Sequence, residues 1–185
     1  MNKAEQYLKN ISVDQSDFAR LRHDLSNLLN DIPKINILYG SGNNGKTTFT
    51  NTLKRHLGDR ITTIPSNLAT TPTCPPTISS WILGKDYIVI QECDLNNLNP
   101  QTLLMLINGS KDFIAKTLYQ SPRQVEVKPK HIIIETNQDP IDFLNDNALN
   151  GRINFIPFNK TIQNRDMNLV NEMLDNPGQL LNFIG

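Results

Sequence analysis

The chain has 185 residues, 38% of them apolar, and its 18 lysines and arginines are balanced by 18 aspartates and glutamates. This length and composition predict one globular domain of ordinary size with a substantial core, and they exclude a disordered chain. A net charge of zero gives no general attraction to nucleic acid, so any such binding has to be local.

Cysteine content and hydropathy limit the cellular setting. Cys74 and Cys93 are the only two cysteines, and they have neither metal-ligand spacing nor the density of a disulfide framework. Residues 1–9 are polar, and no apolar run approaches the roughly 18 residues that span a bilayer. We therefore expect a soluble, intracellular protein.

The two ends of the chain are predicted to be helical. Residues 1–33 carry apolar side chains at helical spacing until Pro33 ends the pattern, and residues 166–175 and 179–184 form two short terminal helices. The N-terminal segment is either a two-helix cap packed on the core or a collar for oligomerisation. Its apolar stripe consists of Phe18, Leu21, Leu25, Leu28 and Leu29.

A complete phosphate-loop motif, G-x-x-x-x-G-K-[ST] (Walker A), follows the N-terminal segment. Residues 35–39 before it are predicted to form a buried strand, and apolar residues after it recur at helical spacing until Gly58. A strand, a glycine-rich loop and a helix are thus present in the order in which the motif has physical meaning. The candidate nucleotide-binding residues are Gly40, Ser41, Gly42, Asn43, Asn44, Gly45, Lys46, Thr47 and Thr48.

Such a loop directs backbone N–H groups and the positive end of a helix dipole at a polyphosphate. Lys46 would reach the β- and γ-phosphates of ATP, and the Thr47 hydroxyl would hold Mg²⁺. The alternative is a glycine-rich turn that binds nothing. The correct flanking patterns favour the phosphate site.

The next informative stretch is residues 87–94, an apolar run that predicts a strand buried on both faces and ends in acids. At the edge of a sheet beside a phosphate loop, a carboxylate can hold the water shell of Mg²⁺ and orient the attacking water. Glu92 is the first candidate and Asp94 the second. Residues 61–80, which precede this strand, are rich in Thr, Ser and Pro and are not expected to form a regular helix.

A basic hairpin is predicted after a helix that Asn99-Pro100 opens and Asn108-Gly109 closes. Its strands would be residues 113–119 and 124–128. Residues 111–130 carry five basic and two acidic side chains, a local net charge of +3. Basic side chains on a projecting hairpin can neutralise phosphates without reading base sequence, but a solvated ribbon has the same composition.

Two further polar side chains stand next to predicted strands. Asn137 ends the apolar strand 131–137, where a neutral amide can hydrogen-bond a γ-phosphate or the attacking water. Arg152 precedes the strand 153–158, where a guanidinium could stabilise a transferring phosphoryl group. Alternatively, Asn137 only opens a turn and Arg152 is an ordinary surface residue.

Taken in series, these features resemble the ATPase domain of the superfamily 3 helicases, most closely the branch found in poxvirus and phage-type primase-helicases. The resemblance extends over residues 34–162. It is carried by G-x-x-N-x-G-K-T, a strand ending in Glu92, Gly109 with Leu118-Tyr119 and a basic hairpin, I-I-I-x-T-N, and Gly151-Arg152-Ile153-x-x-x-Pro157-Phe158.

The resemblance implies roles for single residues. Lys46 and Thr47 match the phosphate and Mg²⁺ residues, and Asn137 matches the sensor asparagine. Glu92 matches the second of two adjacent acids, and this chain departs from the pattern because Gln91 occupies the first place. Arg152 matches the arginine finger, which in the family completes the ATP site of the neighbouring subunit in a hexameric ring.

The same resemblance implies a nucleic-acid partner and further proteins. The hairpin matches the element that grips single-stranded nucleic acid, DNA in preference to RNA, with Lys116, Arg123 and Lys128 as the candidate contacts. The family usually joins this domain to a primase or an origin-binding domain. Because only 33 residues precede residue 34, we expect separate partners of this kind, or a minimal ATPase module.

The sequence therefore predicts an α/β P-loop NTPase, AAA+-like, with a central mainly parallel sheet, a basic β-hairpin and short helical terminal segments. We expect an N-terminal segment at 1–33, an ATPase core at 34–162 and a C-terminal tail at 163–185. The predicted function is an ATP-driven helicase or translocase of viral, phage or mobile-element replication. Two alternatives are a nucleoside or nucleotide kinase, and an ATP-binding assembly module without motor activity.

Overall fold

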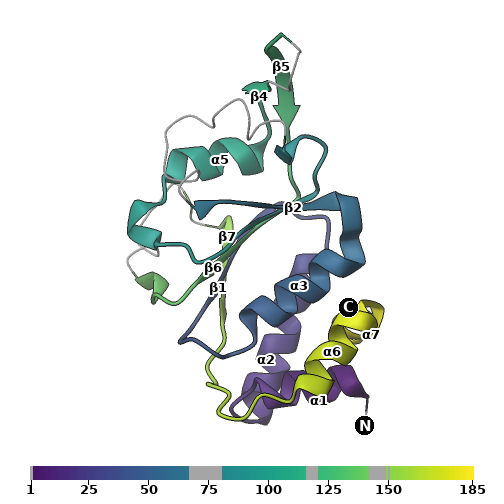
Figure 1. Cartoon of the computed structure of the whole chain (residues 1–185). Helices are drawn as coiled ribbons and strands as arrows, with labels where there is room; N and C mark the ends of the chain where they lie inside the picture. The colour runs from purple at the N-terminus through teal and green to yellow at the C-terminus, as the bar shows by residue number, and fades with distance from the viewer. Residues whose placement is uncertain (1, 67–80, 116–120, 142–148, 150) are drawn as a thin grey trace.

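A five-stranded parallel sheet forms the centre of the computed structural model, which describes residues 2–66, 81–115, 121–141, 149 and 151–185. Its strands run in the order β2 (Ile61–Ile64), β3 (Tyr87–Ile90), β6 (His131–Thr136), β1 (Lys34–Tyr39) and β7 (Ile153–Pro157) (Figure 1). This arrangement confirms the predicted α/β fold with a central, mainly parallel sheet. β2 was not predicted as a strand, because four residues of the pattern Ile-Thr-Thr-Ile give a weak signal.

The central strands are nearly continuous apolar runs because both faces of a parallel sheet are covered. All four residues of β3 and all six of β6 are buried. β1 lies between β6 and β7, with Tyr39 opposite Thr136 on one side and opposite Pro157 on the other. The carboxyl ends of β1, β6 and β7 therefore meet at one edge of the sheet.

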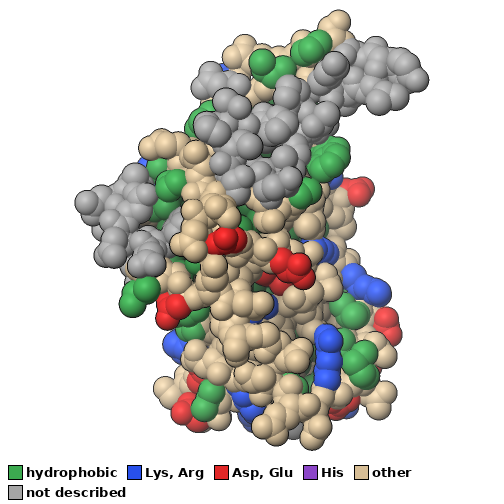
Figure 2. Space-filling model, turned by 60° about the vertical axis from the view of Figure 1, so that its left-hand side comes forward, with side chains coloured by type: hydrophobic (Ala, Val, Ile, Leu, Met, Phe, Trp, Pro, Cys, Tyr) green, Lys and Arg blue, Asp and Glu red, His purple; other side chains and the backbone are tan. Residues whose placement is uncertain are grey.

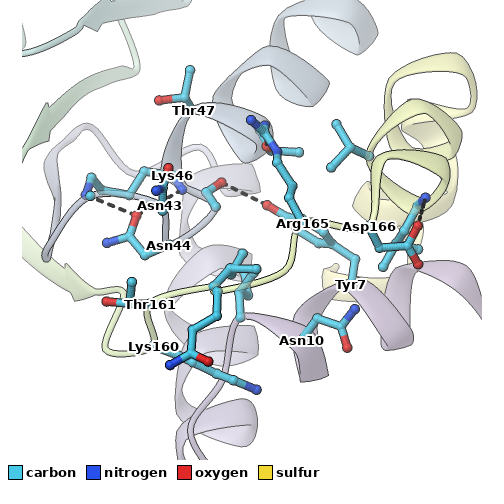
Figure 3. Close-up of a pocket in the computed structure, with 18 of the residues that line it drawn as sticks. Tyr7, Asn10, Asn43, Asn44, Lys46, Thr47, Lys160, Thr161, Arg165 and Asp166 are labelled. Carbon is cyan, nitrogen blue, oxygen red and sulfur yellow. Dashed lines mark hydrogen bonds between the residues drawn. The ribbon is translucent and has the colours of Figure 1, made fainter.

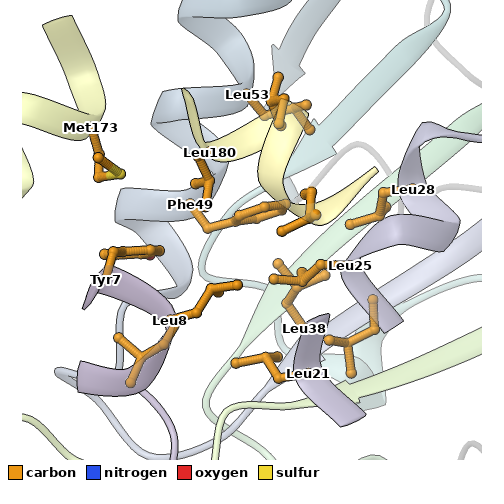
Figure 4. Close-up of a cluster of buried hydrophobic side chains, with 14 of the residues drawn as sticks. Tyr7, Leu8, Leu21, Leu25, Leu28, Leu38, Phe49, Leu53, Met173 and Leu180 are labelled. Carbon is orange, nitrogen blue, oxygen red and sulfur yellow. The ribbon is translucent and has the colours of Figure 1, made fainter. Parts of the chain in front are cut away.

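One face of the sheet is covered by helices from both ends of the chain. These are α1 (Lys3–Asn10), α2 (Gln15–Ser26), α3 (Lys46–Leu57), α6 (Met167–Asp175) and α7 (Pro177–Ile184). Four residues of the predicted stripe are buried and Leu29 is partly buried, and Figure 4 shows Leu21, Leu25 and Leu28 packed beside Phe49 of α3 and Leu180 of α7. The terminal segments thus share one hydrophobic core with the phosphate-loop helix. The proposed boundaries at 33/34 and 162/163 stay predictions.

Helix boundaries follow from side chains that cap the first turn. Asn2, Asp14 and Asp166 each accept a hydrogen bond from a backbone N–H of the helix that follows. Asn99 does the same for α5 (Pro100–Asn108), which has proline in its first turn as predicted. The structure also has short 3-10 helices at Asn27–Leu29, Gly58–Arg60 and Leu95–Asn97.

The other face of the sheet is covered by α5 and by the base of a hairpin. β4 (Ser110–Ala115) pairs antiparallel with β5 (Arg123–Val127), and this ribbon projects from the body of the molecule (Figure 1). Phe113 and Val127 are buried in the core with Leu103 and Leu106 of α5, while Arg123 is exposed. The hairpin begins three residues earlier than the predicted strand. Residues 116–120, which include Lys116, lie outside the described part, as do residues 67–80 of the Pro-rich segment.

Charged side chains of both signs are interspersed over the face shown in Figure 2, in line with the zero net charge. In the described part of the chain, no helix has the length and apolar content needed to cross a bilayer.

Candidate functional site

The predicted phosphate loop connects the end of β1 to the start of α3 through backbone conformations that require glycine. Gly40 has φ +137°, and a Cβ there would lie 2.3 Å from the carbonyl oxygen of Phe158. Gly45 has φ +94°, and a Cβ there would meet Ile11 at 2.8 Å. No side chain caps α3 at Gly45. The N–H group of Lys46 donates to the Asn44 side-chain oxygen at 3.5 Å, while those of Thr47 and Thr48 have no partner within the helix and are available to an anion.

Lys46 lies at the start of α3 and is buried with a relative exposure of 6%. Its Nζ atom donates hydrogen bonds to the Gly40 carbonyl at 2.7 Å and to the Asn44 and Asn137 side-chain oxygens, both at 3.1 Å. All three acceptors are neutral. Burial lowers the pKa of Lys46 to about 8, and the nearby Glu135 carboxylate acts in the opposite direction.

Asn137 is thus placed beside Lys46, although 91 residues separate them. The amide follows β6, the neighbour of β1, so both side chains emerge at the same edge of the sheet. This is the relation that the pattern of parallel strands predicts for a phosphate loop and a polar residue at the end of an adjacent strand.

A carboxylate that the sequence analysis did not select also lies at this edge. Glu135, the second-to-last residue of β6, is only 4% exposed. It accepts hydrogen bonds from the hydroxyls of Thr47 at 2.8 Å and Thr50 at 2.5 Å, and from the Gln91 amide at 3.0 Å. The signal in the sequence was a charged residue inside an otherwise apolar strand.

Glu92 lines the same cavity two residues after the end of β3, which is shorter than predicted. Its φ is +50°, a left-handed conformation that is uncommon outside glycine, and its side chain is exposed. Asp94, the second candidate acid, caps the 3-10 helix Leu95–Asn97 instead. Hydrogen bonds from Gln138 and from the Asn96 backbone lower the pKa of Asp94.

The cavity beside the loop has a volume of about 740 Å³, within the range of small-molecule sites. Its far wall comes from α1 and from the segment that follows β7, with Tyr7 and Arg165 facing the loop (Figure 3). The Tyr7 hydroxyl donates to the Gly45 carbonyl and the Arg165 guanidinium to the Thr48 hydroxyl, both at 2.9 Å. Burial raises the pKa of Tyr7. Neither residue was predicted for the site.

Arg152 and the hairpin lie elsewhere. Arg152 is exposed, precedes β7 at the opposite edge of the sheet, and donates a hydrogen bond to Asn108 at the end of α5. On the hairpin, Arg123 pairs with Ala115 in the last described register before residues 116–120, and Lys128 is exposed at the base against Gly109. The structure therefore brings Lys46, Thr47, Glu92 and Asn137 together and leaves Arg152 and the hairpin residues outside this group.

Comparisons with known proteins agree with this geometry. A family model described as RNA helicase matches residues 36–138, more than half of the chain. An A form apo structure of the NrS-1 C-terminal region is similar at TM-score 0.70 and 16% identity, and a second apo structure of that region at TM-score 0.64 and 14% identity. Each covers 100% of this chain, which spans only 45% of theirs. No curated protein matches.

Proposed function

The chain belongs to the RNA helicase family, which confirms the resemblance to superfamily 3 helicases, and on this premise we propose that it is an ATP-driven motor that moves along single-stranded nucleic acid, DNA in preference to RNA. Its setting would be viral, phage or mobile-element replication. The observation that carries the proposal is the meeting of Lys46, Thr47 and Asn137 beside an open cavity.

The residues at the loop fit a triphosphate. The Lys46 ammonium contacts only neutral oxygens, so among the described residues no carboxylate within hydrogen-bond distance neutralises it. The N-terminal end of α3 adds backbone donors and the positive end of the helix dipole. A polyphosphate would therefore offer Lys46 negatively charged acceptors in place of neutral ones, and would add hydrogen bonds from the backbone of the loop.

The same edge fits Mg²⁺, which prefers hydroxyl and carboxylate oxygens. Thr47 and the acids Glu92 and Glu135 supply such oxygens at the cavity. When bound, Mg²⁺ would neutralise charge on the phosphates. Glu92 is exposed and has no hydrogen-bond partner among the described residues, so it is suited to accept a proton from an attacking water. Asn137 would hydrogen-bond the γ-phosphate. Because Asn137 also accepts a hydrogen bond from Lys46, loss of the γ-phosphate would change that contact.

The nucleoside would occupy the part of the cavity that α1 and the segment after β7 enclose. Ile162 and Val170 offer partly exposed apolar side chains there. Asn10, Lys160 and Arg165 offer polar groups (Figure 3). Arg165 also brings a positive charge near the first turn of α3. A cation from the same subunit would therefore support phosphate binding in addition to Lys46.

The positive charge of the arginine finger would come from a neighbouring subunit. Arg152 lies at the edge of the sheet opposite to the loop, so it does not reach the site of its own chain. Its exposure supports action in trans, at a junction between subunits of a ring, in which a head-to-tail contact repeats around a closed circle. The basic hairpin would contact the nucleic-acid backbone without reading its sequence.

One experiment on a single preparation tests the proposal. Light scattering with and without Mg²⁺-ATP and single-stranded DNA should give the mass of an oligomer, a hexamer in the proposed ring, and strand displacement should depend on ATP. A phosphorylated nucleoside or nucleotide as the product would instead identify a kinase. Full ATP hydrolysis by a protein that stays monomeric under every condition would overturn the ring.

A further inference from the structure

The buried carboxylate of Glu135 touches the residue that is proposed to hold the metal ion. Its Oε2 atom accepts the hydrogen bond from the Thr47 hydroxyl, and its Oε1 atom accepts those from Thr50 and Gln91. Within the described part of the chain, Glu135 forms no direct ion pair, and the positive charges of Lys46 and Lys54 act on it only from beyond ion-pair distance. An ionised carboxylate with so little exposure is costly unless a positive charge compensates it.

The strand that normally supplies the acid is followed directly by an uncharged residue here. In P-loop NTPases, Mg²⁺ is held by the Ser or Thr of the loop together with an acid at the end of a neighbouring strand. β3 ends at Ile90, and the next residue is the uncharged Gln91, whose amide donates to Glu135. Glu92 follows one residue later, with an exposed carboxylate and a left-handed backbone.

The order of strands in the sheet explains how β6 can supply the metal-binding acid in place of β3. β6 lies between β3 and β1, so its carboxyl end is next to the strand that leads into the loop. Because an ionised carboxylate can only accept, the Thr47 hydroxyl uses its one proton on Glu135. The lone pairs of the Thr47 oxygen are then left for a cation.

We propose that Glu135, rather than an acid of β3, is the carboxylate that holds the metal beside Thr47. This inference rests on the proposed nucleotide site, and it assigns a different role to each of the two acids. Glu135 neutralises part of the charge of the divalent cation and positions it, while Glu92 accepts a proton from the attacking water. Gln91 belongs to the arrangement because its amide holds the carboxylate of Glu135.

Mn²⁺, a spectroscopic substitute for Mg²⁺, tests the assignment without relying on hydrolysis. We expect Glu135→Gln to weaken Mn²⁺ binding to the protein with ADP by about 10- to 100-fold, measured by electron paramagnetic resonance. Nucleotide affinity in EDTA should stay within about threefold of wild type, because Lys46 is intact. Glu92→Gln removes the other cavity acid and tests the competing assignment, while the matched control Glu126→Gln removes an exposed carboxylate of β5, outside the cavity, and should bind Mn²⁺ as wild type does.

An exchange variant controls for folding. Gln91→Glu combined with Glu135→Gln keeps one acid and one amide in contact and should regain at least part of the lost Mn²⁺ affinity. A second measurement needs no variant: Fe²⁺ in place of Mg²⁺ should cleave the wild-type backbone close to residues 47 and 135 in the presence of peroxide. Cleavage mainly at residue 92 would overturn the assignment.

The outcomes separate this inference from the proposed function. If wild-type protein binds neither ADP nor Mn²⁺, the nucleotide site itself is refuted. If wild-type protein binds both and Glu135→Gln binds Mn²⁺ equally well, only the role of Glu135 is refuted. Loss of Mn²⁺ binding in Glu92→Gln, with retention in Glu135→Gln, would return the metal to β3.

Discussion

Lys46 is a buried ammonium whose charge depends on what lies next to it. Its pKa of about 8 in the nucleotide-free protein means that a measurable fraction is neutral just above physiological pH. Only the protonated form attracts phosphate, whereas the last ionisation of a phosphate group is complete above roughly pH 6 to 7. A rise in pH through 8 therefore removes charge from the protein and leaves the ligand unchanged.

We predict that ATP affinity, measured by titration in EDTA, falls as the pH rises from about 7 to 9.5. The limiting slope above the pKa is about tenfold per pH unit, because one proton is lost from the site. The variant Lys46→Ala should bind weakly and show no such slope. A flat profile for wild-type protein would contradict a titrating lysine at the phosphate.

Substitutions of Glu92 and of Lys46 are expected to have different effects on ATP binding and turnover. Glu92→Gln should lower ATP turnover by about 10²- to 10⁴-fold, the usual contribution of a general base, while ATP binding is retained. Lys46→Ala should lose binding and turnover together. Steady-state ATPase rates and filter binding separate the two effects. If Glu92→Gln left turnover unchanged, the protein would fit a binding module better than a motor.

Several contacts of the site follow from the sequence, and others depend on the folded chain. The approach of Asn137 to Lys46 was predictable, because residues that follow parallel strands meet at one edge of the sheet. Glu135 was missed because the apolar residues before it led the sequence analysis to treat residues 131–137 as a buried strand with a functional residue only at its end. Tyr7 and Arg165 were missed because segments far apart in sequence reach the loop only through tertiary packing, for which no spacing rule exists.

Helix α1 and the residue that caps its end contact the phosphate loop from outside the predicted ATPase core. The Tyr7 hydroxyl donates to the Gly45 carbonyl, and Ile11 lies against the same glycine. We predict that Tyr7→Phe lowers the free energy of unfolding by about 1 kcal/mol, the usual net value of one hydrogen bond, and weakens ATP binding as the loop loosens. Urea unfolding measures the first effect.

A surface change on the same helix serves as the control. Lys9→Ala removes a surface ion pair with Glu5 and a cation–π contact with the Phe18 ring at 5.8 Å, and together these are expected to change the stability by about 1 kcal/mol or less. Equal unfolding curves for wild type and Tyr7→Phe would show that α1 covers the loop without stabilising it.

The hairpin is anchored in the core and exposed beyond it, a division that its sequence predicted in outline. Buried Val125 and Val127 alternate with exposed Gln124 and Glu126 on β5. Its charge pattern could not distinguish a nucleic-acid contact from a solvated ribbon, since both carry the same lysines. Binding measurements must decide between them.

We predict that Lys116→Ala, Arg123→Ala and Lys128→Ala together weaken single-stranded DNA binding. Each phosphate contact that is lost should reduce the slope of log affinity against log salt by about 0.7. The control removes three positive charges elsewhere, from Lys3, Lys9 and Arg55 on α1 and α3. Fluorescence anisotropy over a series of salt concentrations distinguishes the two variants. If both lose affinity equally, net charge explains the effect and the hairpin does not.

The molecule as a whole combines zero net charge, one phosphate site and an arginine turned away from it. In the proposed ring, each subunit would offer Arg152 to its neighbour's loop. Catalysis would then depend on two chains that meet at one junction, and a substitution could disable the contribution of either chain separately. The helices at the two chain ends pack on the same face of the sheet as α3 (Figure 1), whereas Arg152 is exposed at the amino end of β7.

We predict that Arg152→Ala and Lys46→Ala proteins are each inactive as ATPases but regain activity when mixed. A junction is intact when the Arg152→Ala subunit supplies Lys46 and the Lys46→Ala subunit supplies Arg152. Random mixing at equal amounts therefore restores about a quarter of the junctions, for a head-to-tail ring. The matched control pairs Arg152→Ala with the double variant, in which no finger is present, and should stay inactive. Absence of rescue at every ratio would refute a finger that acts between subunits.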